Sequence, residues 1–228
     1  MKKIFGIIFI LLFGISALAQ KGGIEILETG GFHGEEITAK TGEIWLGLFR
    51  QNENFVLLPS VITVEEVNDP IVDGPEDRSG KEVKVLGREA PLFLIRGRGF
   101  VQSREVKTVF AGPELINRNF NRDYEFSGQK YNLRVEGEKG ETPENLNQTS
   151  ALVLSRGEIK QVLYKPEKCD DCVWQINWAG DIDGDGRLDF YMYLTDHYNV
   201  ARMKLFLSSS AGKGALVKEA AEFVTTGC

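Results

Sequence analysis

Short stretches in which hydrophobic and polar residues alternate recur along this chain and predict β-strands. They are "EIWLGLF" (43–49), "NFVLLPSVITVEEV" (54–67), "PLFLIRG" (91–97), "REVKTVF" (104–110), "YNLRVEG" (131–137), "SALVLS" (150–155) and "EIKQVLY" (158–164). The first two are hydrophobic on both faces, which is typical of strands between two layers. Gly-containing turns at 127–129 and 155–157 predict hairpins. One short helix is predicted after Pro113, through "ELINRNF" (114–120).

The last sixty or so residues have the most regular pattern. The hydrophobic runs there are "VWQINW" (173–178), "LDFYMYL" (188–194), "MKLFL" (203–207) and "LVKEAAEF" (216–223). Alternation predicts one face with Trp174, Ile176 and Trp178 in the first run, and Leu188, Phe190, Met192 and Leu194 in the second. The fold class predicted for the chain is therefore mainly β, an antiparallel sandwich or meander with few short helices. An aspartate-rich turn falls in a C-terminal β-hairpin.

The first twenty residues, "MKKIFGIIFILLFGISALAQ", have the order of a secretory signal peptide. Their hydrophobic run is too short to cross about 30 Å of hydrocarbon comfortably. Small residues at Ala17 and Ala19 suit a signal peptidase, and no cysteine follows for a lipid anchor. We therefore expect a signal peptide over 1–19 and a secreted or periplasmic protein that is not stably inserted in a membrane. The β-rich exported domain would span 20–228, with 68–80 and 137–148 as the loops where it could subdivide.

Net charge and cysteine usage narrow the class of protein further. The chain has 27 Lys and Arg against 33 Asp and Glu, a net charge of −6 that becomes −8 when Lys2 and Lys3 leave with the signal. Such acidity disfavours nucleic acid as a partner, because phosphates are bound through clustered basic residues. Cys169, Cys172 and Cys228 predict one structural disulfide in an oxidising compartment, with the pairing left open. A redox pair or half of a zinc site fits the surrounding sequence less well.

The stretch "WAGDIDGDGRLDF" (178–190) carries the clearest chemistry. Its aspartates are Asp181, Asp183, Asp185 and Asp189. Neighbouring carboxylates repel one another, and a hard cation such as Ca²⁺ would offset that repulsion. Counted from Asp181, Gly186 stands sixth, where the loop must turn sharply, and Arg187 stands seventh, where its carbonyl could coordinate while its side chain points away. Met192 takes the twelfth position, where a helix–loop–helix calcium site carries a glutamate.

The residues "DIDGDGRLD" (181–189) resemble the DxDxDGxxD calcium loops of FG-GAP and VCBS repeats, which are of the integrin-α type. In those repeats the loop joins two β-strands. The resemblance implies Ca²⁺ as the cofactor and a metal site formed by Asp181, Asp183, Asp185, Asp189 and the carbonyl of Arg187. The wider stretch, through "DHYN", "LFLSS" and the closing "GC", resembles exported bacterial proteins that carry one such loop, and this resemblance implies no activity.

Two functions from different classes follow from these features. The favoured one is an exported calcium-binding β-rich protein whose ion is structural and which binds a protein or glycan partner without catalysis. The alternative is a secreted hydrolase acting on a polymer, glycan or peptide. Both histidines fall in segments that are read as loops, "FHGEE" (32–36) and "TDHYN" (195–199), and no G-x-S-x-G nucleophile motif accompanies them.

Overall fold

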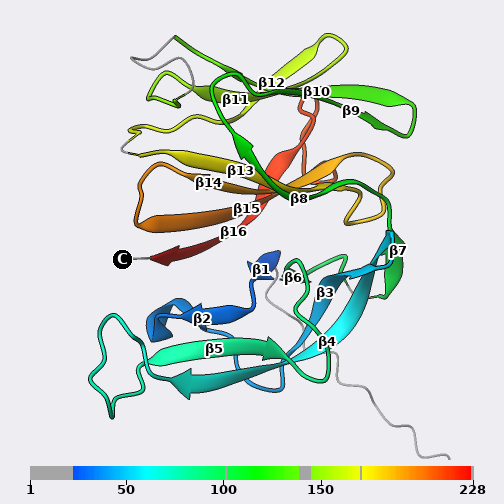
Figure 1. Ribbon diagram of the computed structural model, residues 1–228. Helices are drawn as coiled ribbons and strands as arrows, with labels where there is room; N and C mark the ends of the chain where they lie inside the picture. The colour runs from blue at the N-terminus through cyan, green and yellow to red at the C-terminus, as the bar shows by residue number, and fades with distance from the viewer. Residues whose placement is uncertain (1–22, 101, 139–144, 170, 227–228) are drawn as a thin grey trace, which may run out of the picture.

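The computed structural model describes residues 23–100, 102–138, 145–169 and 171–226. In this part of the chain the fold is mainly β, with all strand pairs antiparallel, and its sheets stack as three layers (Figure 1). The fold class predicted from the sequence is confirmed. The predicted signal peptide, 1–19, lies outside the described residues. No helix within the described ranges has the length and hydrophobicity needed to span a membrane.

The first layer is a seven-stranded sheet formed by the N-terminal half of the chain. Its strands are β1 (Glu25–Leu27), β2 (Gly30–Phe32), β3 (Ile44–Gln51), β4 (Asn54–Val67), β5 (Gly80–Val85), β6 (Leu94–Arg96) and β7 (Arg104–Val106). They are ordered β1-β6-β3-β4-β5-β2, with β7 also paired to β4. A single turn of 3-10 helix, η1 (Gly34–Glu36), follows β2. The fourteen-residue β4 pairs with β3 and β7 in its first half and with β5 in its second.

The other two layers are built from the remaining strands in an interleaved order. The central sheet contains β8 (Thr108–Ile116), β13 (Val173–Gly180), β14 (Asp189–Thr195), β15 (Val200–Leu207) and β16 (Lys218–Thr226). The outer four-stranded sheet contains β9 (Asn121–Phe126), β10 (Gln129–Glu136), β11 (Ala151–Arg156) and β12 (Ile159–Tyr164). The chain therefore enters the central sheet with β8, leaves to build the whole outer sheet, and returns for the predicted C-terminal meander β13–β16.

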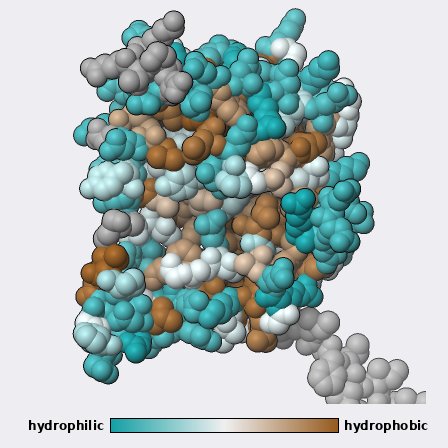
Figure 2. Space-filling view, viewed as in Figure 1, coloured by the Kyte–Doolittle hydropathy of each residue, from teal (hydrophilic) through white to brown (hydrophobic). Residues whose placement is uncertain are grey.

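The central sheet is buried on both faces, and two hydrophobic cores result. The core shared with the first sheet takes Trp178, Tyr191, Met203, Leu205 and Phe223 from the central strands. The core shared with the outer sheet takes Trp174, Ile176, Phe190, Met192 and Leu194. In Figure 2, hydrophobic residues on the visible face gather along the boundaries between layers, while polar residues cover most of the rest. The two runs predicted to lie between layers, 43–49 and 54–67, instead form β3 and β4 of the first sheet.

Two sequence predictions about these strands are wrong. Trp178 does not share a face with Trp174 and Ile176, because the register of β13 with β14 shifts between Ile176 and Trp178. An extra residue at such a bulge turns the side chains that follow to the opposite face. The tryptophan enters the first core, where its Nε1 donates to Thr108 Oγ1 at 3.0 Å.

The helix predicted after Pro113 is also wrong, because Thr108–Ile116 is strand β8. This strand is the edge of the central sheet, where a proline that lacks an N–H costs no ladder hydrogen bond. Its pairing with β13 skips Gly112 and Pro113 opposite the same bulge. The strand then ends in a turn in which Phe120 N donates to Asn117 O at 3.0 Å.

Each loop at which the chain could subdivide joins two neighbouring strands of one sheet. Residues 68–79 connect β4 to β5, and residues 137–150, of which 139–144 are not described, connect β10 to β11. The predicted disulfide joins Cys169 to Cys172, whose Cα atoms lie 5.1 Å apart, in the connection between β12 and β13. Cys228 lies outside the described residues.

Candidate metal centre

The aspartate-rich segment connects β13 to β14, two adjacent antiparallel strands of the central sheet. It begins where Asp181 N donates to the carbonyl of Lys107 at 2.9 Å, and it ends at Asp189, the first residue of β14. Gly184 and Gly186 have φ angles of 80° and 81°, a region that residues with a Cβ rarely adopt. These glycines let the chain curl tightly enough for the aspartates to approach one another.

Asp181 is buried and organises the backbone of the turn. Its Oδ1 accepts hydrogen bonds from the N–H groups of Gly184 at 2.7 Å and Asp185 at 3.0 Å. Its Oδ2 accepts one from Gly186 N at 2.9 Å. Backbone donors directed at a carboxylate partly compensate for taking its charge out of water. Asp181 is therefore held in place by the loop that it shapes.

Asp189 is fully buried, with no exposed surface. Its Oδ2 accepts a hydrogen bond from Ile182 N at 2.9 Å, and its Oδ1 accepts one from Ser208 N at 2.7 Å. The Ser208 hydroxyl lies 2.9 Å from the same Oδ1. Burial, and then the negative charge of Asp183, raise the pKa of Asp189 to about 8. A carboxylate in this position is costly to ionise unless a positive charge is bound beside it.

Asp183 is partly buried and lies at the outer side of the turn. The Ser209 hydroxyl donates to its Oδ2, and Asp185 N donates to its Oδ1 at 3.2 Å. Burial raises the pKa of the Asp183 carboxyl, and the negative charges of Asp185 and Asp181 add to that effect. Burial and neighbouring negative charge therefore make both Asp183 and Asp189 unfavourable to ionise.

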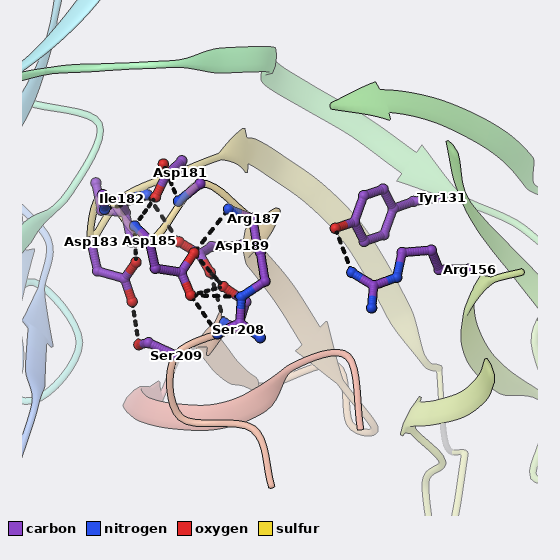
Figure 3. A network of polar contacts seen from close by, with 12 residues as sticks. Tyr131, Arg156, Asp181, Ile182, Asp183, Asp185, Arg187, Asp189, Ser208 and Ser209 are labelled. Carbon is purple, nitrogen blue, oxygen red and sulfur yellow. Dashed lines mark hydrogen bonds and ion pairs between the residues drawn. The ribbon is translucent and has the colours of Figure 1, made fainter. Parts of the chain in front are cut away.

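The structure brings together three of the predicted ligands. Asp181, Asp183 and Asp189 each offer one carboxylate oxygen, and these oxygens all lie within 4.8 Å of one another. Figure 3 shows these side chains gathered in the turn, with Ser208 and Ser209 reaching them from the segment after β15. A set of hard oxygen donors at this spacing fits a hard cation, and it does not suit a metal that prefers sulfur or nitrogen.

The other two predicted ligands, Asp185 and Arg187, are arranged differently. The Asp185 Oδ2 accepts hydrogen bonds from the Arg187 side chain, at 2.9 Å from Nε and 2.6 Å from Nη2. It also lies 2.8 Å from the Ser208 hydroxyl. The Arg187 side chain therefore folds back onto the loop instead of pointing away. Coordination by Asp185 and by the Arg187 carbonyl stays a prediction.

Three residues beside the loop were not found by sequence reasoning. Ser208 and Ser209 follow β15, and Arg104 belongs to β7 of the first sheet. The Arg104 guanidinium donates to the carbonyl of Ile182 and, at 2.7 Å, to the carbonyl of Asp183. Nearly eighty residues separate Arg104 from these carbonyls, so no local pattern could have indicated the contact. The guanidinium fixes the loop to the neighbouring layer.

The two histidine-containing segments form turns, as expected. In 195–199 the Thr195 hydroxyl donates to the carbonyl of His197 at 2.9 Å, and the His197 ring stacks on Tyr198 with ring centres 4.7 Å apart. Asp196 lies 3.7 Å from the Arg202 guanidinium. In 32–36, His33 precedes η1 and its Nδ1 is hydrogen-bonded to Asp69.

No protein-family model, no curated protein and no solved structure matches this chain. The likeness of 181–189 to FG-GAP and VCBS loops therefore stays a resemblance of one short segment. The function is therefore inferred from the residues of the turn and the contacts that position them.

Proposed function

We propose that this protein is an exported calcium-binding β-rich protein, in which the ion stabilises the fold and the role is to bind a protein or glycan partner without catalysis. The main support for calcium binding is that the Asp181, Asp183 and Asp189 side chains each offer a carboxylate oxygen within 4.8 Å of the others. Burial and mutual repulsion make it unfavourable to ionise all three carboxyls without an ion, and a divalent cation between them would favour the ionised forms.

The type of donor and the partial exposure of the turn favour calcium over magnesium. Calcium accepts six to eight oxygens in irregular geometry, whereas magnesium demands a compact octahedron and keeps several of its waters. The loop offers carboxylate oxygens from a curled backbone with Asp183 still partly exposed, so additional carbonyl or water ligands have access. A flexible coordination sphere of this kind suits the larger ion.

A structural role for the ion is supported by what surrounds the carboxylates. Asp181 binds three backbone N–H groups of its own loop, and Asp189 binds the backbone of Ile182 and Ser208. Arg104 joins the loop to the first sheet. An ion in the turn would therefore connect segments that already converge there.

Export is supported by the Cys169–Cys172 disulfide, because such bonds persist in oxidising compartments. Export also agrees with a calcium site of modest affinity. Extracellular calcium modules commonly bind in the range of about 10⁻⁴ to 10⁻³ M, close to the concentrations they encounter. That the partner is a protein or a glycan rests on the proposed export of the protein alone, since the excess of acidic residues over basic ones only disfavours nucleic acid.

The proposal is tested by measuring the melting temperature of the mature protein as a function of free calcium. Ligand that binds only the folded state stabilises it by RT ln(1 + [Ca]/Kd), which is about 2.7 kcal/mol at a hundredfold excess over Kd. The variant Asp183→Ala removes one converging carboxylate and should lose the calcium-dependent rise. Glu158→Ala is the matched control, since it removes an exposed acid from the β11–β12 turn.

The results separate the alternatives. A wild-type melting temperature that rises with calcium but much less with magnesium, and a control that behaves like the wild type, would support the site. A melting temperature that chelator leaves unchanged, together with no heat of binding at millimolar calcium, would show that the segment is an acidic turn without an ion.

A further inference from the structure

A second polar site lies far from the aspartate turn, where three distant segments meet. The turn after β2, the loop between β4 and β5, and the end of β16 come together on one side of the molecule (Figure 1). Thr226 contacts Glu36 there, with its N–H and hydroxyl both donating to Glu36 Oε1. Two adjoining hollows of about 320 and 570 Å³ open at this junction, and both are lined by His33 and Asp69.

His33 and Asp69 form an oriented pair at the wall of these hollows. The Asp69 side chain is only 4% exposed, and its Oδ2 is hydrogen-bonded to His33 Nδ1. Its Oδ1 accepts a hydrogen bond from Ile71 N at 3.1 Å. A buried carboxylate on one ring nitrogen fixes the orientation of an imidazole and favours its protonated form. The other nitrogen, Nε2, has no hydrogen-bond partner within the described part of the chain.

The remaining acids near the hollow, with one exception, are occupied by protein donors. Glu36 Oε2 accepts a hydrogen bond from His33 N at 3.1 Å, and its Oε1 is taken by Thr226. Asp73 accepts hydrogen bonds from Asp69 N at 2.9 Å and Ser79 N at 2.7 Å. The exception is Glu35, which lines the larger hollow, is exposed, and has no ion pair among the described residues.

One further cation faces the same space. Lys81 of β5 lines the larger hollow and donates to the carbonyl of Ile37 at 2.8 Å. An ammonium group has three hydrogens, so two of them are available to a ligand. The larger hollow therefore presents unused donors from His33 and Lys81 and one unused acceptor, the carboxylate of Glu35.

Aliphatic side chains also line the larger hollow. Ile71 is 53% exposed and Val72 is 67% exposed, and both line the larger hollow. Binding sites for small molecules commonly combine a hydrophobic lining with a few polar groups that fix orientation. A ligand that complements this arrangement carries a negative group, a positive group and an aliphatic body.

We propose that this hollow binds a small zwitterion with an aliphatic side chain, such as an α-amino acid of the leucine type. Its carboxylate is held by His33 and Lys81, its ammonium by Glu35, and its side chain by Ile71 and Val72. A zwitterion has no net charge, so the surplus of acids around the hollow does not repel it as it would a simple anion. The inference does not depend on the calcium site.

The electrostatics of His33 give the binding a pH dependence. Hydrogen bonding to Asp69, with further contributions from the negative charges of Asp69, Glu36 and Glu35, raises the pKa of His33 above its ordinary value. Lys81 of β5 lines the same hollow, and Asp73 lies beside Asp69 in the β4–β5 loop, where it accepts a hydrogen bond from Asp69 N. Affinity should therefore be highest below the pKa of His33 and should fall as the pH rises through it.

The test uses a matched set of ligands on the intact mature protein. L-leucine is compared by calorimetric titration with 4-methylpentanoate, which lacks the amino group, and with 3-methylbutylamine, which lacks the carboxylate. L-leucine should bind at least tenfold more tightly than either. The His33 ring signal should shift on binding, and it can be assigned because the chain has two histidines and His197→Gln removes the other. This comparison needs no variant of the site, so a folding defect cannot obscure it.

Variants supply a second readout. Lys81→Met and Glu35→Gln should each weaken leucine binding by tenfold or more. Lys84→Met is the control, because Lys84 lies on the same strand but pairs with Glu82 at 2.6 Å and does not line the hollow. Equal binding of the amine alone or of the carboxylate alone would overturn the assignment of a zwitterion. Absence of leucine binding at millimolar concentration, or an unshifted His33 signal, would overturn the site.

Discussion

Replacing Asp189 with Asn tests whether the buried carboxylate of the turn destabilises the protein when no ion is bound. Asp189 has no exposed surface, and its pKa of about 8 in the folded protein compares with an ordinary value of 3.8. Between these two pH values the folded chain holds a proton at Asp189 that the unfolded chain has released. Stability falls with rising pH wherever the folded state binds more protons, so the ion-free protein should weaken steadily over this range.

The expected magnitude follows from the width of that pH window. Each pH unit between the two pKa values changes the free energy of unfolding by about 1.4 kcal/mol, so the ion-free wild type should lose about 3 kcal/mol between pH 5 and pH 7. Asn cannot ionise, and its variant should lack this slope. The amide nitrogen cannot accept, so either the Ile182 N–H or the Ser208 N–H loses its acceptor, at a cost of about 1–3 kcal/mol that does not vary with pH. The slope, and not the absolute stability, is therefore the quantity to compare.

The assay is urea denaturation in the presence of chelator at pH 5, 6 and 7, with Glu158→Gln as an exposed control. His33 also contributes a loss of stability as the pH rises above its ordinary pKa, but it does so equally in every variant, and the difference between wild type and Asp189→Asn removes it. Saturating calcium should flatten the wild-type profile, because a coordinating carboxylate gives up its proton. Parallel profiles for wild type and Asp189→Asn in chelator would show that Asp189 is already ionised in the folded protein and that the burial argument is wrong.

Three further outcomes are expected. Trp178→Ala should lower the free energy of unfolding by about 3–5 kcal/mol, because it empties a fully buried site and leaves Thr108 without its partner, and a loss below about 1 kcal/mol in urea denaturation would contradict the packing. Arg104→Ala should cost about 2–4 kcal/mol, since two loop carbonyls lose charged donors, with Arg104→Lys intermediate by the same measurement. Thiol titration of the denatured, non-reduced protein should find one thiol per chain, that of Cys228, because Cys169 is bonded to Cys172.

Local alternation was sufficient to predict most strands, because each needs only a buried and an exposed face or two buried faces. The run 54–67 is β4 from end to end, and the four C-terminal runs form the meander that was predicted. Periodicity carries no information about an inserted residue, and this is why the bulge before Trp178 was missed. Pro113 was misread for a related reason. The same residue that can begin a helix also fits the edge of a sheet, and sequence alone does not tell which strand will be the edge.

For the candidate site, too, local contacts were predictable from the sequence and long-range contacts were not. The spacing of the aspartates predicts that they share one turn, and the three that converge belong to the predicted set. The residues that hold the turn from outside are Arg104 of β7 and Ser208 after β15, and they reach it only when β15 pairs with β14 and the first sheet packs on the central one. The pairing of His33 with Asp69 joins positions 36 residues apart, so no local pattern in the sequence could indicate it.

The position of the aspartate turn explains why an ion bound there would stabilise more than a hairpin. Ile182 and Leu188 are both fully buried, but Ile182 packs into the core shared with the first sheet and Leu188 into the core shared with the outer sheet. The turn thus contributes one side chain to each core, and Arg104 connects its backbone to a third element. A cation that compensates the buried, closely spaced carboxyls of the turn would therefore strengthen the contacts of the central sheet with both neighbouring sheets. A structural ion has its largest effect at such a junction, because the free energy of binding adds to the stability of every segment that must separate when the turn opens.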